Sequence, residues 1–389
     1  RRVYEHVYRE FCRLARVPPQ TIEAHADMFC CMLGLVRGRI YYNLHNWYRL
    51  VSVLPGYRLN RRFMEQMMGV RESLPDDSAE AQAAAGTGAK LLDALHAAHS
   101  FVALAAAILA LPRRMERFSQ RLRDTLGSER PDLSGQRSDE LVGYYRNLES
   151  RLLTHWDAPI VNDFATMLFH GLLRRLATAW VGDEQATLSN DLLCADRGMV
   201  SEDPALRVRA MARLAMADAA LPQALATGSL HAMRQAIRRH PDLDRELQAY
   251  LDKFGDRCID ELKLESSTLH EDPTPLLRAI GQAAQQLDRH DDARDPGLAQ
   301  REVRERAEAR VRQALRGKPL RRIAFAWVLR HARHSVRWRE NLRFERTRVF
   351  GRARQILLEL GSRFAAIDCI DAPRDVFYLE LDEVLGFVE

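Results

Sequence analysis

The sequence predicts a mainly α-helical protein with at most one or two short strands. Apolar residues recur at helical spacing along most of the chain, and capping residues or prolines precede several of these stripes. Runs of strand-forming residues are confined to residues 39–43 and 376–379. Of the 389 residues, 47% are hydrophobic, which suffices for one large core or two adjoining cores. Charged residues make up 29% of the chain, and a composition of this kind does not indicate a disordered tail.

Helix boundaries follow from local signals. Helix starts are indicated at Ser138, Asp203-Pro204 and Thr274-Pro275. Gly255 follows a stripe that ends at Phe254, so we expect a left-handed helix stop there. Two long helices are expected over residues 296–317 and 320–361.

The two strand-like segments need partners, because an isolated strand leaves its backbone groups without hydrogen bonds. We expect residues 39–43 and 376–379 to pair with each other, or each to join a sheet of a neighbouring domain. Loops are expected over residues 127–138 and 74–88, which are rich in Gly, Ser, Asp or Pro.

Composition narrows the class of protein. The six cysteines form no CxxC pair and no disulfide framework, which indicates reduced thiols. The most apolar stretch, residues 101–111, is too short for a bilayer span of about 20 residues, so we expect a buried helix there. No signal peptide opens the chain, and we expect a cytoplasmic protein. The chain begins at Arg1 without an initiator Met and ends at Glu389 without a polar tail, so we also expect a segment of a longer polypeptide.

No complete catalytic motif is present, and we assign no catalytic residue and no metal ligand. Residues 86–90 only superficially resemble a phosphate-binding loop, because the lysine is misplaced and Leu91 follows it. Two His-x-x-His pairs, His96/His99 and His331/His334, place both rings on one helix face and could share a metal, although no third ligand is evident.

Positive charge is concentrated in one region. Between Arg301 and Arg354, 17 Arg and one Lys stand against five Glu, an excess of 13 positive charges. Arg339 and Arg346 fall on or beside an apolar helical stripe. The stripe consists of Val328, Ala332, Val336, Leu342, Val349, Ala353, Ile356, Leu360 and Phe364. Arginine is rarely buried without a partner. Either Glu340 and Glu345 or acidic groups of another helix neutralise these two residues, or they face an anionic ligand in a cavity. Nucleic acid is the least favoured of these partners, since no binding motif accompanies the arginines.

Several short motifs, in family order, carry a resemblance to known proteins. They are residues 38–44, Asn46-Trp47-Tyr48-Arg49, Leu54-Pro55-Gly56, residues 60–65, Phe254-Gly255-Asp256-Arg257, residues 261–265, Asp272-Pro273, Arg339-Glu340-Asn341, Gly361, residues 375–379 and Asp382-Glu383. Together they resemble the central region of phosphoenolpyruvate synthase-like, PEP-utilizing enzymes and of rifampicin phosphotransferase, between the ATP-grasp and phosphohistidine domains. At Asp256 the chain departs from the relatives, which often have His.

The resemblance implies a division of labour in a parent protein. An ATP-grasp domain, using ATP and Mg, would phosphorylate a histidine on a mobile domain that delivers the phosphate. Residues 1–75 would follow the ATP-grasp domain, residues 76–370 would form the helical central domain, and residues 371–389 would lead to the phosphohistidine domain. Both partner domains would belong to the same polypeptide. No histidine here sits in the glycine-rich setting of the phosphohistidine domain, so this chain alone should bind no cofactor and transfer no phosphate.

Three hypotheses follow. The first is a central linker and substrate-binding region of a phosphoenolpyruvate synthase-like phosphotransferase, with Arg257, Arg339 and Arg346 facing an anionic small molecule, since arginine offers a rigid donor fork for phosphate or carboxylate. The second is a helical interaction module whose basic face binds an acidic protein or nucleic acid. The third is a metal-dependent enzyme that uses the histidine pairs. No membrane partner is expected under any of them.

Overall fold

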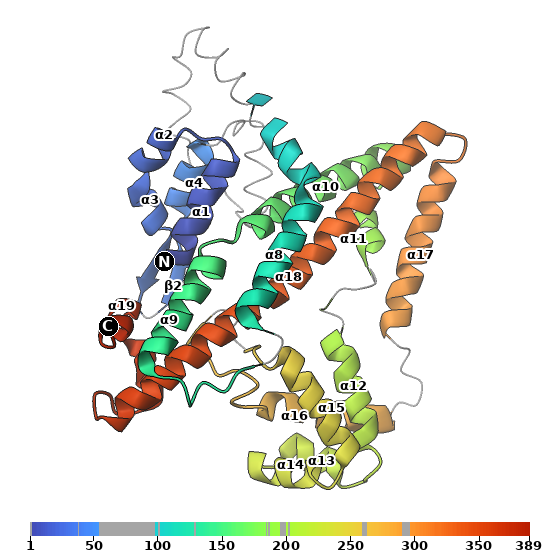
Figure 1. Cartoon of the computed structure of the whole chain (residues 1–389). Coiled ribbons are helices and arrows are strands. Elements are labelled where there is room, and N and C mark those ends of the chain that lie inside the picture. Colours follow the sequence, from blue (N-terminus) through green and yellow to red (C-terminus); the bar gives the residue numbers. More distant parts are fainter. Residues whose placement is uncertain are drawn as a thin grey trace. The chain divides into compact units, whose positions relative to one another are not determined.

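The computed structural model confirms a mainly helical protein (Figure 1). The structure describes residues 2–37, 39–53, 98–99, 102–127, 130–183, 185, 187–194, 200, 203–258, 263–289 and 296–389. Several features predicted from the sequence lie outside the described residues. They are the expected loop at 74–88, the glycine-rich segment at 86–90, residues 54–65 of the family motifs, His96 and the first residue of the apolar stretch 101–111. Within the described part, no helix is both long and apolar enough to cross a membrane.

The chain divides into two compact units, and the division falls within α8 (Leu111–Leu126), at the start of the π-helix η1 (Glu149–Leu153) and within α10 (Asp157–Val181). Unit 1 holds residues 1–121 and 150–162, and unit 2 holds residues 122–149 and 163–389. The domain boundaries expected from the sequence, near residues 75 and 370, stay a prediction.

Unit 1 contains short helices and one hairpin. Its elements are α1 (Arg2–Leu14), α2 (Pro19–Ala24), α3 (Ala26–Cys30), β1 (Leu33–Val36), β2 (Arg39–Tyr42), α4 (Leu44–Val53), the first part of α8 (Leu111–Leu126), the π-helix η1 (Glu149–Leu153) and the start of α10 (Asp157–Val181). Its N-terminal core gathers Met28, Phe29 and Met32 against Trp47 and Leu50 of α4.

The strand predicted at 39–43 is confirmed, but its partner is a different one. β2 pairs antiparallel with β1, with Leu33 opposite Tyr42 and Val36 opposite Arg39. The predicted strand at 376–379 is wrong: residues Pro373–Tyr378 form a 3-10 helix, η2. Its first turn is capped locally, since the Ala372 amide donates to the Asp375 carboxylate at 2.9 Å. The predicted pairing of the two segments is therefore wrong as well.

Unit 2 is built around a helical cluster and one long helix. Its helices are the end of α8, α9 (Ser138–Leu148), the greater part of α10, α11 (Leu188–Leu193), α12 (Asp203–Ala215), α13 (Leu221–Thr227), α14 (Leu230–Ile237), α15 (Pro241–Phe254), α16 (Thr274–Arg289), α17 (Pro296–Ala314), α18 (Pro319–Ala366), η2 and α19 (Leu381–Gly386). Helices α12 to α16 share one core, which Phe344 of α18 also contacts. The expected starts at Ser138, Asp203 and Thr274 and the two expected long helices are confirmed.

Helix α18, orange and red in Figure 1, is the longest helix of unit 2. Its 48 residues would extend about 72 Å at 1.5 Å per residue. Eight of the nine stripe residues predicted from the sequence are buried, and Val336 is half-buried. The loop that begins at Gly127 is confirmed over residues 130–137, and α18 holds it: Gln355 donates to the Pro131 carbonyl at 2.7 Å, and Arg363 donates to the Ser138 hydroxyl at 3.1 Å.

The predicted left-handed helix stop at Gly255 is wrong, because its φ is −66°, which any residue adopts. Glycine is required there for space. A β-carbon at Gly255 would overlap the imidazole of His270 and the Leu251 carbonyl. The close approach of the loop that follows α15 explains this glycine.

Helix packing in unit 2 gives the first testable prediction. A β-carbon at Gly281 of α16 would collide with backbone atoms of α13, 2.5 Å from the Ala226 nitrogen. We expect Gly281→Ala to lower the free energy of unfolding by about 1–3 kcal/mol, because two packed backbones must separate. Gly143→Ala on α9 is the matched control, since nothing lies within 4 Å of that position.

Alanine favours helix by about 0.5–1 kcal/mol over glycine, so the control should unfold at the wild-type midpoint or above it. Urea denaturation followed by circular dichroism measures both. Equal midpoints for the two variants would contradict the close packing of α13 on α16.

Candidate functional site

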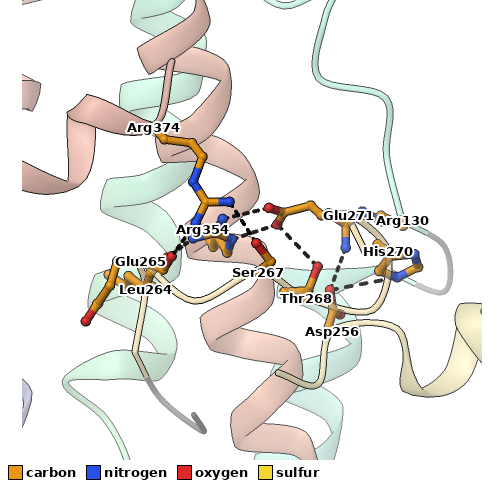
Figure 2. Close-up of polar contacts among 10 residues, drawn as sticks. All are labelled: Arg130, Asp256, Leu264, Glu265, Ser267, Thr268, His270, Glu271, Arg354 and Arg374. Carbon is orange, nitrogen blue, oxygen red and sulfur yellow. Dashed lines mark hydrogen bonds and ion pairs between the residues drawn. The ribbon is translucent and has the colours of Figure 1, made fainter. Parts of the chain in front are cut away.

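The candidate site is the segment between α15 and α16, where it lies against α18 (Figure 2). This segment carries the Phe254-Gly255-Asp256-Arg257 motif. It folds back on itself, because the Leu269 amide donates to the Arg257 carbonyl at 3.0 Å and the His270 amide donates to the Gly255 carbonyl at 3.1 Å. An isolated bridge between Cys258 and Thr268 lies beside these bonds. The backbone thereby brings Asp256, His270 and Glu271 close together.

Arg354 of α18 forms the central ion pair with Glu271. Its Nε and Nη2 donate to the two carboxylate oxygens, each at 2.6 Å, while its Nη1 donates to the Leu264 carbonyl. The Arg354 side chain is only 3% exposed, so removing its charge from water is costly unless every donor finds an acceptor. The planar fork of arginine matches a carboxylate in this bidentate way. The Phe377 ring lies 4.7 Å from the guanidinium and covers it.

Asp256 forms a second ion pair beside the first. Its Oδ1 accepts from Arg130 at 2.5 Å and lies 3.9 Å from the His270 imidazole. Gly351 of α18 makes room for this carboxylate, since a β-carbon there would lie 2.5 Å from the Asp256 Cγ. Burial raises the pKa of Asp256, and the charges of Arg130, Arg352 and Arg348 oppose that rise.

Two more arginines complete this group of contacts. Arg374, the second residue of η2, donates to the Ser267 hydroxyl at 2.7 Å and to the Glu265 carbonyl at 2.8 Å. Arg352 of α18 is buried and donates to the Leu126 carbonyl at 3.0 Å and to the Tyr144 hydroxyl. We name the set Arg130, Asp256, His270, Glu271, Arg352, Arg354 and Arg374 the arginine clamp. It joins the motif segment to α18 and to the segments that flank α9 and η2.

The clamp is organised for holding rather than for proton transfer. Both oxygens of Glu271 already accept bonds from Arg354, and Thr268 donates to one of them at 3.3 Å. Burial lowers the pKa of His270 to about 4, helped by the nearby Arg130 charge, so this imidazole is neutral at pH 7. The imidazole of His270 carries no charge, and the charge of Glu271 is balanced by Arg354, so these groups anchor the loop but are not placed to transfer protons.

The arginines predicted from the sequence lie in two places. Arg339 of α18 is exposed, and its Nε lies 3.5 Å from the Asp163 carboxylate of α10. Burial raises the pKa of Asp163, whereas the charges of Arg339 and Arg346 oppose that rise. The structure thus brings these two arginines to one acidic group of another helix, which is one of the two alternatives left open by the sequence. Arg257 is half-buried in the motif segment.

Sequence reasoning missed the arginines that are most buried. The stripe pattern pointed to Arg339 and Arg346, yet Arg352 and Arg354 are the ones excluded from water. Their acceptors, the Leu126 carbonyl and Glu271, lie 226 and 83 residues away along the chain. The local sequence pattern therefore does not predict that Arg352 and Arg354 are buried. The only nearby hint is Gly351, the small residue beside Arg352.

The second histidine pair has aromatic surroundings. His331 stacks on Phe169 at a centroid distance of 4.9 Å and contacts Trp327 at 4.5 Å, and His334 meets the edge of Trp338 at 4.3 Å. Across the portion of the chain that the structure describes, no group of three or more His, Cys, Asp and Glu side chains is arranged to hold a metal ion.

Residues 159–340 match the family model described as the rifampicin phosphotransferase fourth domain. The match covers slightly less than half of the chain, and this region is similar to that domain of rifampicin phosphotransferase. The matched region contains Asp256 and Glu271 of the arginine clamp, while Arg130, Arg354 and Arg374 come from outside it. No curated protein matches the chain.

The central ion pair predicts a large effect of a single substitution. Glu271→Gln leaves the buried Arg354 without a countercharge, and we expect the free energy of unfolding to fall by about 3 kcal/mol or more. Glu302→Gln is the control, because its ion pair with Arg306 on α17 is exposed at both side chains. That substitution should cost less than about 1 kcal/mol. Urea denaturation at pH 7 compares them; similar losses in the two variants would contradict the clamp.

The neutral histidine predicts a pH dependence. Since the pKa of His270 is about 4 in the folded protein and near 6.5 when unfolded, the unfolded chain binds more protons between these values. Stability should therefore fall as the pH is lowered from 6.5 to 4. His270→Gln should flatten this part of the profile, measured as the urea midpoint at each pH. A variant with the wild-type slope would show that His270 does not carry it.

Proposed function

We propose that this chain is the central helical linker and substrate-binding region of a phosphoenolpyruvate synthase-like, ATP-dependent phosphotransferase. The match of residues 159–340 to a rifampicin phosphotransferase domain carries the proposal. The arginine clamp supports it, because the clamp fixes the family motif at 254–257 on a long rigid helix. Residues 1–75 would follow an ATP-grasp domain, residues 76–370 would form the central domain, and residues 371–389 would lead to a phosphohistidine domain.

In this proposal the chain positions and holds, and its partner domains perform the chemistry. ATP and Mg would bind to the ATP-grasp domain, and this chain would need neither. The whole parent protein would work in the cytoplasm. Coding sequence for both catalytic domains in the same reading frame would support the proposal, and stop codons directly on both sides of residues 1–389 would refute it.

The anion-facing role of Arg257, Arg339 and Arg346 gives a binding prediction. Each substitution to lysine keeps the charge but loses the two-pronged donor, so phosphoenolpyruvate should bind about tenfold more weakly to the affected variant. Arg245→Lys is the control, because Arg245 is exposed and, among the described residues, forms an ion pair only with Asp242 of its own helix.

Isothermal titration calorimetry with phosphoenolpyruvate measures the four variants. Wild-type affinity in all three site variants would remove these arginines from the proposed site. Formation of phosphoenolpyruvate from ATP and pyruvate by the isolated chain would refute the holding role itself.

One observation favours a second candidate, a helical interaction module. The first turns of α18 expose Leu320, Ile323 and Trp327, with 82%, 67% and 45% of their surfaces accessible. Arg321 and Arg322 lie among them, so this end of the helix is both apolar and basic. An acidic protein or a nucleic acid would fit such a surface. A gel shift that weakens steeply with salt would support nucleic-acid binding, and no shift at low salt would exclude it.

A further inference from the structure

A second cluster of arginines lies in unit 1, around a cavity of about 410 Å³ between the start of α8 and the start of α10. The lining residues are Ala110, Arg113, Arg114, Arg117, Phe118, Arg121 and Asp157. Spacings of three and four residues place Arg113 or Arg114, Arg117 and Arg121 on one side of α8. A cavity of this volume is within the range of small-molecule sites, about 300–1,000 Å³.

One arginine of the cavity is fixed by the protein. Arg121 donates to the Asp157 carboxylate and to the His155 carbonyl, both at 2.6 Å. Its guanidinium also lies 5.2 Å from the centre of the Phe118 ring. Asp157 is the single acidic residue of the lining, so it balances Arg121 and no other positive charge of the cavity.

The other three arginines are left with their donors available. Within the described part of the chain, the side chains of Arg113, Arg114 and Arg117 make no hydrogen bond or ion pair. Arg113 and Arg117 are exposed, and Arg114 is half-buried. Like charges on one helix face repel, and the free energy of this arrangement falls when an anion enters between them.

The cavity has a firm apolar side. Phe118 is buried and meets the Trp156 ring edge-on at 4.9 Å. This packing joins α8 to the residues just before α10, so the arginines project from a fixed helix rather than from a loop. Because the helix backbone that carries the arginines is fixed, only their side chains must be ordered when an anion binds, which lowers the entropic cost of binding.

We propose that this cavity binds a small phosphorylated molecule through a diphosphate group. Four arginines against one aspartate leave three positive charges in the lining, which a diphosphate balances. Arg113, Arg114 and Arg117 supply donor forks suited to phosphate oxygens, and buried Phe118 is the apolar residue of the lining against which they are held. This inference goes beyond the proposed function and rests on unit 1 alone.

The test uses inorganic pyrophosphate as the probe in isothermal titration calorimetry at low salt. Arg113→Gln with Arg117→Gln removes two charges that have no structural partner in the described part, so the fold should persist. We expect this double variant to bind pyrophosphate at least tenfold more weakly. The matched control is Arg213→Gln with Arg312→Gln, which removes two exposed charges from α12 and α17 in unit 2.

The control variant should bind within twofold of wild type. No binding of pyrophosphate at millimolar concentration, or an equal loss in both double variants, would overturn the proposal. Binding of single-stranded RNA through Arg113 and Arg117 without binding of pyrophosphate would also overturn it. None of these outcomes bears on phosphoenolpyruvate binding at Arg257, Arg339 or Arg346, so the two proposals fail separately.

Discussion

The ion pair between Arg354 and Glu271 is the constraint on which the centre of unit 2 depends. A guanidinium that is almost excluded from water must be matched donor by donor, and this match fixes the segment between α15 and α16 on the long helix α18. Gly351 one turn earlier admits Asp256, and Arg130 joins the loop before α9 to the same place. Segments more than 200 residues apart thereby share one polar centre.

This arrangement gives the motif at 254–257 a fixed place in unit 2. The motif at 254–257 supplies a carboxylate and a tight backbone approach, and the clamp places both against a helix of 48 residues. Its acidic groups are occupied by arginines, and its histidine is neutral near pH 7. Such a centre is suited to transmitting position between flanking segments. The arginine cavity of unit 1 differs, because its guanidinium groups have donors to offer to a ligand.

The sequence predicted the helices well because their signals are local. Apolar spacing along α18, the proline at position 204 and the loop from Gly127 each depend on neighbours within a few residues. The sequence predictions failed where contacts between residues far apart in the chain determine the structure. Residues 376–379 have strand-forming side chains, but a local cap and burial of Val376 favour a 3-10 helix over Pro373–Tyr378. Arg352 and Arg354 resembled ordinary charged helix residues until the fold brought Leu126 and Glu271 to them.

A double-mutant cycle between Arg354→Met and Glu271→Gln tests the clamp most directly. It compares the free energy of unfolding of the two single variants and the double variant with that of wild type, and so isolates the interaction between the two side chains. We predict a coupling energy of about 2 kcal/mol or more, because Glu271→Gln leaves the buried guanidinium of Arg354 without its countercharge and Arg354→Met leaves the Glu271 carboxylate without its bidentate donor. Additive losses, with a coupling energy near zero, would show that the two residues act independently and would contradict the clamp.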